Sequence, residues 1–206
     1  MIFDITPPVV SGMAVWPGDT PPSREMLLEL ARGDPVTLST LRATVHLGAH
    51  ADAPNHYGLD GRDIAAQPID LYLGPCEVMR FPGPRGGLVL PPMLPRRPET
   101  PRVLLATGTA APPGRFDEQF AALHPDLVDY LHEAGVRLVG TDAPSVDPFA
   151  SKELPAHHRF LAHDMAILEG LALEGVPEGR YELIALPLRL VGFDASPVRA
   201  VLRPLR

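Results

Sequence analysis

Proline occupies 26 of the 206 positions, more than twice its usual share of about 5%, and divides the chain into short segments. Proline and glycine together make up about a fifth of the residues, below the roughly 25–30% that is typical of disordered chains. Leucine, valine, isoleucine and phenylalanine account for 58 residues, which is enough apolar side chain for a substantial core. The sequence therefore predicts a folded protein and excludes a disordered or fibrous one.

Acidic residues outnumber basic ones, and the formal net charge is −7 at pH 7. This balance offers no basic surface to nucleic acid or anionic lipid, so we expect neither as a partner. No apolar run approaches the ~20 residues of a membrane span, and the N-terminus does not resemble a signal peptide. The single cysteine, Cys76, excludes an intramolecular disulfide and is expected to be a small buried residue. These features together predict a cytoplasmic protein.

Helix and strand patterns alternate along the chain in the manner of an α/β protein. Residues 125–134 predict a helix, because apolar residues recur at helical spacing between Pro125 and Gly135. A buried strand is expected directly after it at 136–140. A second helix is expected at 155–165, strands at 1–5, 37–45, 76–81, 102–107, 181–190 and 198–203, a loop at 51–63 and an exposed excursion at 82–102. No segment resembles a linker, so we predict a single domain over residues 1–206.

Six of the eight histidines fall within 46–56 and 157–163, where random scatter would place fewer than one. Core packing does not require such clustering, whereas histidine is the commonest metal ligand and acid–base residue near neutral pH. A continuing strand would hold His46 and His50 about 13 Å apart, so the chain must curl at Gly48 for both to reach one ion. After that curl, His46, His50 and Asp52 form a ligand set typical of hydrolytic zinc sites.

His56 completes the first cluster and follows Pro54, which stiffens the loop. A histidine held off the metal in this way suits a general acid–base residue. The cluster is not the HExxH motif of metalloproteases, because position 47 is leucine. The sequence also lacks GxSxG, GxGxxG and P-loop motifs, so any chemistry is expected to be metal-assisted.

The second cluster contains His157, His158 and His163, and Glu169 follows it. On one continuous helix His157 and Glu169 would lie about 18 Å apart, so the helix must end before Glu169 if both bind one metal pair. We expect one of the three histidines to be a ligand and the others to lie on a solvated helix face. Asp142, Ser145 and Asp147 form a polar turn, and their side chains are expected mainly to cap that turn with hydrogen bonds.

The H-x-G-x-H-x-D-x-P-x-H form of residues 46–56 resembles the metal-dependent cyclase-like hydrolases. Segments 15–21, 72–76, 140–148, 151–152, 167–171 and 181–188 are similar to the bacterial kynurenine formamidase (arylformamidase) branch of that family. The resemblance extends over residues 3–203. It implies a single α/β domain with a central, mostly antiparallel β arrangement flanked by helices. It also implies a homodimer or larger assembly.

The resemblance implies a two-zinc site in each subunit, with manganese or another divalent ion as alternatives. The implied ligands are His46, His50, Asp52, His157 and Glu169, with Asp52 and Glu169 bridging the ions. The twelve-residue spacing to Glu169 selects His157 over His158. The same resemblance implies that His56 is the proton donor and acceptor and that Trp16 contacts the substrate. For Trp16, packing as a core aromatic next to a turn is the alternative role.

The implied reaction is hydrolysis of N-formyl-L-kynurenine to L-kynurenine and formate in the kynurenine pathway of tryptophan catabolism. A metal-bound hydroxide would attack the formyl carbon, and His56 would move a proton to the departing aryl amine. Two alternatives stay open at this point: a sister hydrolase of the isatin hydrolase type acting on another amide, and a non-catalytic metal-binding protein. The spare histidine His56 argues against the second, because a purely structural metal site does not need it.

Overall fold

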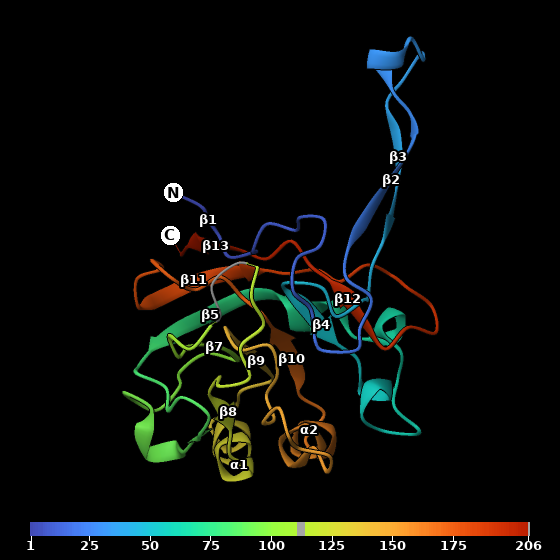
Figure 1. The fold of residues 1–206 in the computed structure, drawn as a ribbon. Coiled ribbons are helices and arrows are strands. Elements are labelled where there is room, and N and C mark those ends of the chain that lie inside the picture. Colours follow the sequence, from blue (N-terminus) through green and yellow to red (C-terminus); the bar gives the residue numbers. More distant parts are fainter. Residues whose placement is uncertain (111–113, 206) are drawn as a thin grey trace.

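A nine-stranded mixed sheet forms the centre of the protein, and two helices cover one of its faces (Figure 1). The computed structural model describes residues 1–110 and 114–205. In chain order, the strands of this sheet are β1 (Phe3–Asp4), β4 (His50–Asp52), β5 (Leu73–Arg80), β7 (Arg102–Ala106), β9 (Leu138–Thr141), β10 (Ala166–Glu169), β11 (Gly179–Ile184), β12 (Ala195–Pro197) and β13 (Val201–Pro204). The helices are α1 (Pro125–Glu133) and α2 (Pro155–Ala162).

The strands lie side by side in the order β1-β13-β11-β5-β7-β9-β10-β4-β12. Five of the eight pairings are antiparallel, whereas β5, β7, β9 and β10 run parallel to one another. The helices α1 and α2 form the crossovers from β7 to β9 and from β9 to β10, because parallel strands need such connections. The expected α/β fold with a central, mostly antiparallel β arrangement is therefore confirmed, although the four middle strands are parallel and both helices lie on the same face.

Two apolar cores lie on the two faces of the sheet. In β7, Val103 and Leu105 pack with the helix residues Leu127 and Phe160, while Leu104 packs into the opposite core. This alternation follows from the period of two along a strand. The core that contains Leu104 lies on the face of the sheet opposite the helices, inside its curl. The central strands are therefore buried on both faces.

Both expected helices are present. The first helix ends before Gly135, whose φ of +85° continues the turn after the helix, as the sequence pattern predicts. The second helix ends at Ala162, three residues earlier than expected. Asp164 there has a φ of +51°, which turns the chain directly into β10. This early end brings Glu169 back toward the start of the helix.

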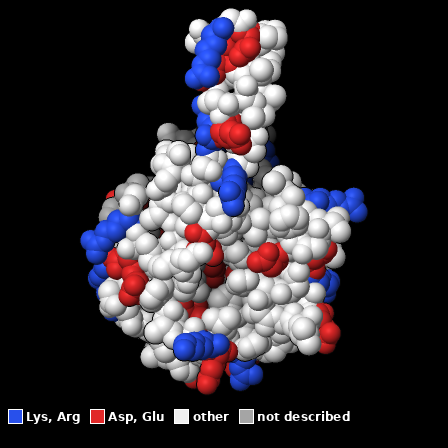
Figure 2. All heavy atoms as spheres, turned by 45° about the vertical axis from the view of Figure 1, so that its right-hand side comes forward, with Lys and Arg blue, Asp and Glu red and all other residues white. Residues whose placement is uncertain are grey.

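An arm formed by residues 23–42 stands away from the body of the protein (Figures 1 and 2). It contains β2 (Ser23–Leu28), a 3-10 turn at Leu30–Arg32 and β3 (Leu38–Arg42), and its two strands pair only with each other. The predicted strand 37–45 is therefore shorter than expected and lies outside the main sheet. The strand β2 is not predictable from the sequence pattern, because its exposed and partly charged residues lack a β alternation.

Other expectations about strands and loops need correction. The expected loop 51–63 contains part of β4, which is buried because β10 and β12 pair with its two edges. The strand expected at 181–190 ends at Ile184, shortly before Pro187, and the strand expected at 198–203 occupies Val201–Pro204. The bounds of these strands depend on pairing with strands that are distant in sequence, so local patterns did not predict them.

The excursion at 82–102 is only partly exposed. Within it, β6 (Leu88–Val89) pairs with β8 (Ala122–Leu123), and Val89 is fully buried. The buried carboxylate of Glu77 on β5 accepts hydrogen bonds from the backbone N–H groups of Glu99 (2.6 Å) and Thr100 (3.1 Å). Arg96 donates a further hydrogen bond to Glu77 at 3.0 Å. These contacts hold the end of segment 82–102 against the sheet.

Cys76 is fully buried on β5, and this desolvation raises the pKa of its thiol to about 12. The predicted small buried residue is therefore confirmed. Among the described residues, no helix has the length and apolar character needed to cross a membrane.

Candidate active site

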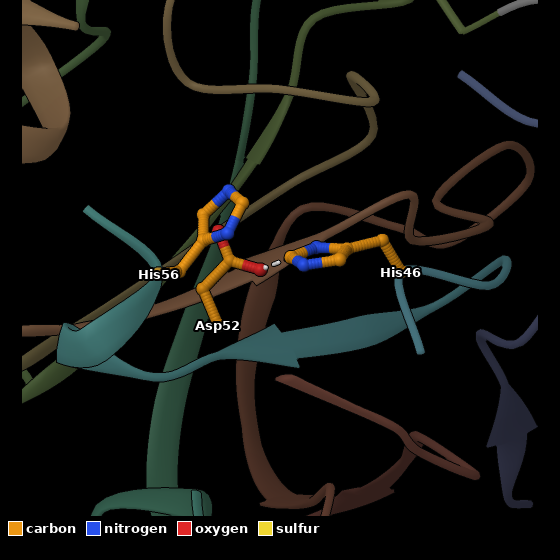
Figure 3. A group of neighbouring side chains, drawn as sticks. All are labelled: His46, Asp52 and His56. Atoms are coloured by element: carbon orange, nitrogen blue, oxygen red, sulfur yellow. Dashed lines mark ion pairs between the residues drawn. The ribbon is translucent and has the colours of Figure 1, made fainter. Parts of the chain in front are cut away.

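Two neighbouring strands and the start of a helix bring the predicted site residues together. On the antiparallel pair of β4 and β10, His50 lies directly opposite Glu169, and Asp52 lies two residues from His50 on the same face. His157 lies in the first turn of α2, which packs over that face. Figure 3 shows the side chains of His46 and His56 directed toward Asp52.

The carboxylate of Asp52 lies at the centre of this group. Its Oδ1 is 3.1 Å from His46 Nδ1 and 3.4 Å from His50 Nε2, and its Oδ2 is 3.5 Å from His157 Nε2. Glu169 lies on the other side, with Oε2 at 3.4 Å from His50 Nε2 and Oε1 at 3.7 Å from His157 Nε2. All five residues predicted as metal ligands thus lie in one cluster.

The curl expected at Gly48 is present, with a φ of +57° that favours glycine. The Gly48 carbonyl lies 2.9 Å from His50 Nδ1 and orients that imidazole. Gly170 directly follows β10, the strand that pairs with β4. A Cβ added to Gly170 would lie only 2.3 Å from the Gly48 carbonyl oxygen. The loops next to His50 and Glu169 therefore pack backbone against backbone, which fixes the distance between these two residues.

The donor atoms of this cluster fit divalent cations. His50 Nε2 and both carboxylate oxygens of Asp52 are buried without a hydrogen-bond partner, an arrangement that is costly unless a cation satisfies them. Ligand atoms around a tetrahedral zinc ion lie about 3.3 Å apart, as follows from bonds of about 2.0–2.1 Å, and the distances given above match this spacing. Asp52 belongs to two candidate ligand groups, one with His46 and His56 and one with His50 and Glu169.

The second ring nitrogens of the ligand histidines are also held in place. His157 Nδ1 lies 2.7 Å from Asp147 Oδ2, and His46 Nε2 lies 3.0 Å from Asp194 Oδ2. Metal-binding histidines typically have such carboxylate or carbonyl partners, which set the orientation and tautomer of the ring. Asp147 also accepts hydrogen bonds from the backbone N–H groups of Ala156 and His157 at the start of α2.

The sequence analysis did not assign Asp147 or Asp194 to the site. Asp147 was expected mainly to cap a turn, and its position ten residues before His157 is the signal in the sequence that links it to the second cluster. Asp194 is 148 residues from His46, and it reaches the site because β12 pairs with β4, with Ala195 opposite Asp52. Asp142 does cap a turn, since it accepts hydrogen bonds from Thr107 and Gly108.

The electrostatics of the cluster follow from its carboxylates. Burial opposes ionisation, but hydrogen bonds and charge from neighbouring carboxylates raise the pKa of His46 to about 9 and that of His157 to about 10. Asp52 is also buried, yet its close contacts with the imidazoles of His157 and His46 hold its pKa well below the usual range. The carboxylates thus favour positive charge at this place, whether it comes from protons or from a metal.

His56 differs from these ligands. It lies in the 3-10 turn Pro54–His56, and burial lowers its pKa below the ordinary value. Its ring is 4.3 Å from that of His46, and its Nδ1 is 3.5 Å from Asp194 Oδ2. An imidazole with a lowered pKa, partly exposed, therefore lies beside the cluster. Of the remaining histidines, His158 is exposed and His163 bonds to Asp129.

A cavity of about 890 Å³ opens in front of the cluster. Its lining includes Trp16, His46, His56, His157 and Glu169. Figure 2 shows acidic side chains in and around a hollow below the arm. The cavity is large enough for an aromatic amino-acid derivative.

Trp16 lies in the wall of this cavity and packs against three phenylalanines. Its ring centroid is 5.3 Å from that of Phe116, 6.2 Å from Phe120 and 5.0 Å from Phe149. The indole therefore combines aromatic packing with a position on the cavity surface. Both roles considered from the sequence are compatible with this placement.

Residues 3–148 match the model of the Cyclase family, which is well over half of the chain. The chain belongs to the Cyclase family. A solved structure described as a potential metal-dependent hydrolase with cyclase activity is 30% identical to this cyclase-family chain, with a TM-score of 0.84 and coverage of 98% of this chain and 96% of the other. A predicted metal-dependent hydrolase from Bacillus stearothermophilus is 31% identical, with a TM-score of 0.81 and coverage of 98% and 97%.

The same fold occurs in isatin hydrolase A from Labrenzia aggregata, at 22% identity, a TM-score of 0.82 and coverage of 98% of this chain and 93% of that one. The chain thus belongs to the Cyclase family and has the fold of solved structures that are described as metal-dependent hydrolases. The cluster of histidine and carboxylate side chains agrees with such chemistry.

Proposed function

We propose that this cyclase-family chain is a metal-dependent arylformamidase that hydrolyses N-formyl-L-kynurenine to L-kynurenine and formate. The observation that carries the proposal is the buried, unpaired donor set of His50 and Asp52 beside the neutral imidazole of His56. The aromatic wall of the cavity, with Trp16 at its surface, supports an aryl substrate.

The proposed ligands for two zinc ions are His46, His50, Asp52, His157 and Glu169, with manganese or another divalent ion as alternatives. When bound, such ions supply Lewis acidity and lower the pKa of a coordinated water toward neutrality. Asp52 and Glu169 contact histidines on both sides of the cluster, so both carboxylates would take part in holding the ions.

The remaining steps belong to the side chains of the protein. Water adds to the formyl carbon, the bond from this carbon to the aryl nitrogen breaks, and the departing nitrogen gains a proton. His56 is neutral and partly exposed to the cavity, so it can accept a proton during addition of water and donate it to the aryl amine. Trp16 stacks on the aryl ring and holds the formyl group toward the cluster.

An absorbance assay of N-formyl-L-kynurenine hydrolysis tests the proposed function. The purified protein should be active with zinc or manganese, inactive after treatment with a chelator, and active again after metal is restored. Isatin, a cyclic aryl amide, serves as the competing substrate. Turnover of isatin without turnover of N-formyl-L-kynurenine would favour the sister hydrolase, and hydrolysis that resists complete metal removal would contradict the mechanism.

We expect His56→Ala to lower kcat by roughly 10²–10⁴-fold, because the variant lacks the group that transfers the proton. Metal content measured by elemental analysis should stay at the wild-type level. His158→Ala is the matched control, since His158 is exposed on α2, and its kcat should be unchanged. Full activity of His56→Ala with metal bound would exclude the acid–base role.

We expect Trp16→Ala to raise KM for N-formyl-L-kynurenine by about 2–10-fold, which corresponds to a stacking contribution of roughly 0.5–1.5 kcal/mol. Trp16→Phe should retain most of the affinity, because it keeps an aromatic ring in the cavity wall. Steady-state kinetics of both variants measure the effect. An unchanged KM in Trp16→Ala would assign this residue to packing against the phenylalanines alone.

A further inference from the structure

One arginine lies in the wall of the cavity, among many acidic side chains. The lining contains the carboxylates of Asp19, Asp117, Asp142, Glu169 and Asp194. Within residues 1–110 and 114–205, the lining contains no lysine and no arginine other than Arg115. Apart from the histidine cluster, Arg115 is therefore the side chain of this wall that attracts an anionic group of a ligand.

The charge of Arg115 is not used by the protein itself. The nearby carboxylate of Asp117 accepts a hydrogen bond from Arg85 at 2.6 Å and another from the backbone N–H of Gln119 at 3.0 Å. Arg115 forms neither an ion pair nor a side-chain hydrogen bond with any residue in the described part of the chain. A guanidinium presents its N–H donors in a planar fork that matches a carboxylate. Arg115 is therefore available to a ligand that carries this group.

The backbone places Arg115 beside the aromatic wall of the cavity. Arg115 directly precedes Phe116, whose ring centroid lies 5.3 Å from that of Trp16 and 5.6 Å from that of Phe149. Both Arg115 and Trp16 line the cavity. An aromatic surface next to an available cation suits a ligand that combines an aryl ring with a carboxylate.

The two candidate substrates differ in this feature. N-formyl-L-kynurenine has a keto side chain that ends in an α-amino acid, so it carries a carboxylate several bonds away from its formyl group. Isatin is an uncharged aryl amide and gains nothing from a cation in the cavity wall. A contact with Arg115 would therefore favour the formylated amino acid over an uncharged amide of similar size.

We propose that Arg115 is a specificity-determining residue, which binds the carboxylate of the substrate and selects N-formyl arylamines with an anionic side chain over uncharged aryl amides. This inference rests on the proposed function, because it takes the formyl group as the reacting end. The aryl ring is then held by Trp16 and the carboxylate by Arg115, and these two contacts direct the formyl group toward the cluster. Arg115 does not touch the reacting atoms, so it acts on KM rather than on proton transfer.

Steady-state kinetics with two substrates test this role. The compound ortho-formamidoacetophenone has the same formylated aryl ketone as N-formyl-L-kynurenine but lacks the amino-acid group. In Arg115→Gln, the ratio of kcat/KM for N-formyl-L-kynurenine to that for ortho-formamidoacetophenone should fall by about 5–20-fold, because a charge-assisted hydrogen bond is lost at an exposed site.

Two further variants complete the kinetic test. Arg115→Lys should recover part of the ratio, since it keeps the positive charge. The matched control is Arg180→Gln, which changes an exposed arginine of β11 outside the cavity lining and should have the ratio of the wild type. An unchanged ratio in Arg115→Gln would overturn the inference and leave the proposed function intact.

A binding measurement tests Arg115 without turnover. Trp16 is the single tryptophan of the chain, so quenching of its fluorescence reports on ligands in the cavity. L-kynurenine should bind Arg115→Gln about 5–20-fold more weakly than it binds the wild type. The analogue ortho-aminoacetophenone lacks the amino-acid group and should bind both proteins with equal affinity.

The outcomes separate this inference from the proposed function. A wild-type protein that does not hydrolyse N-formyl-L-kynurenine would contradict the proposed function, yet the difference in binding would still support Arg115 as a carboxylate site. Three results would overturn the inference: no binding of L-kynurenine to the wild type, undiminished binding to Arg115→Gln, or an equal loss for both ligands.

Discussion

Replacing Asp52 with asparagine is expected to abolish hydrolysis and to weaken binding of divalent cations by at least about 100-fold. Removal of a residue that only orients a ligand costs roughly 10–100-fold in metal affinity or activity, and Asp52 itself contacts three histidines. An amide has no negative charge and offers one oxygen where the carboxylate offers two. The loss therefore affects the whole cluster rather than one ligand position.

Three measurements separate this effect from misfolding. Elemental analysis should show little metal in Asp52→Asn, the hydrolysis assay should show no turnover, and circular dichroism should show an intact fold. Added zinc should raise the Tm of the wild-type protein and leave that of the variant unchanged, because only a bound ligand stabilises the native state. The matched control is Asp60→Asn on an exposed turn, and it should behave as wild type. An Asp52→Asn protein with normal metal content would refute the assignment of Asp52 as a ligand.

Replacing Glu77 with alanine is expected to destabilise the protein by about 3–5 kcal/mol. The Glu77 carboxylate is fully buried and accepts hydrogen bonds from two backbone N–H groups and from Arg96. Its removal leaves the buried Thr100 N–H and the partly buried Glu99 N–H and Arg96 donors without this acceptor, which costs far more than the net contribution of an ordinary hydrogen bond. The site residues lie on other strands, so metal content should be retained by the folded fraction.

Urea denaturation followed by circular dichroism measures the change in the free energy of unfolding. For a chain of this size, 1 kcal/mol corresponds to a Tm shift of roughly 2–4 °C, so Glu77→Ala should lower Tm by about 6–20 °C. The matched control is Glu178→Ala, since Glu178 also pairs with Arg96 but lies near the surface. Exposed ion pairs contribute about 0–1 kcal/mol, and the control should therefore stay close to wild type. Equal effects of the two substitutions would rule out a special role for the buried carboxylate.

The parts of the fold that could be predicted are those with strong local signals. The helix at 125–133 has its own start and stop residues, and the buried strand that follows it reads as an uninterrupted apolar run. The cluster His46, His50 and Asp52 was identifiable because one short curl brings its members together. Local spacing was sufficient in these cases because the partners are near in sequence.

The parts that could not be predicted depend on contacts between distant residues. The strand β4 has only three residues, and it becomes a strand because β10 and β12 pair with its two edges. Asp194 joins the site through the same pairing, and no spacing rule connects it with His46. The arm was partly missed for a different reason, since its exposed strands lack the alternation that burial on one face produces.

The close approach of Gly170 to the Gly48 carbonyl affects how a metal ion would bind. Since main-chain packing sets the separation of His50 and Glu169, the binding site is preorganised before any ion arrives. An ion that enters such a site does not have to drive a folding transition, in contrast to zinc fingers, where binding energy is used to fold the chain. The fold is therefore expected to persist when a bound ion is removed or replaced by another divalent ion.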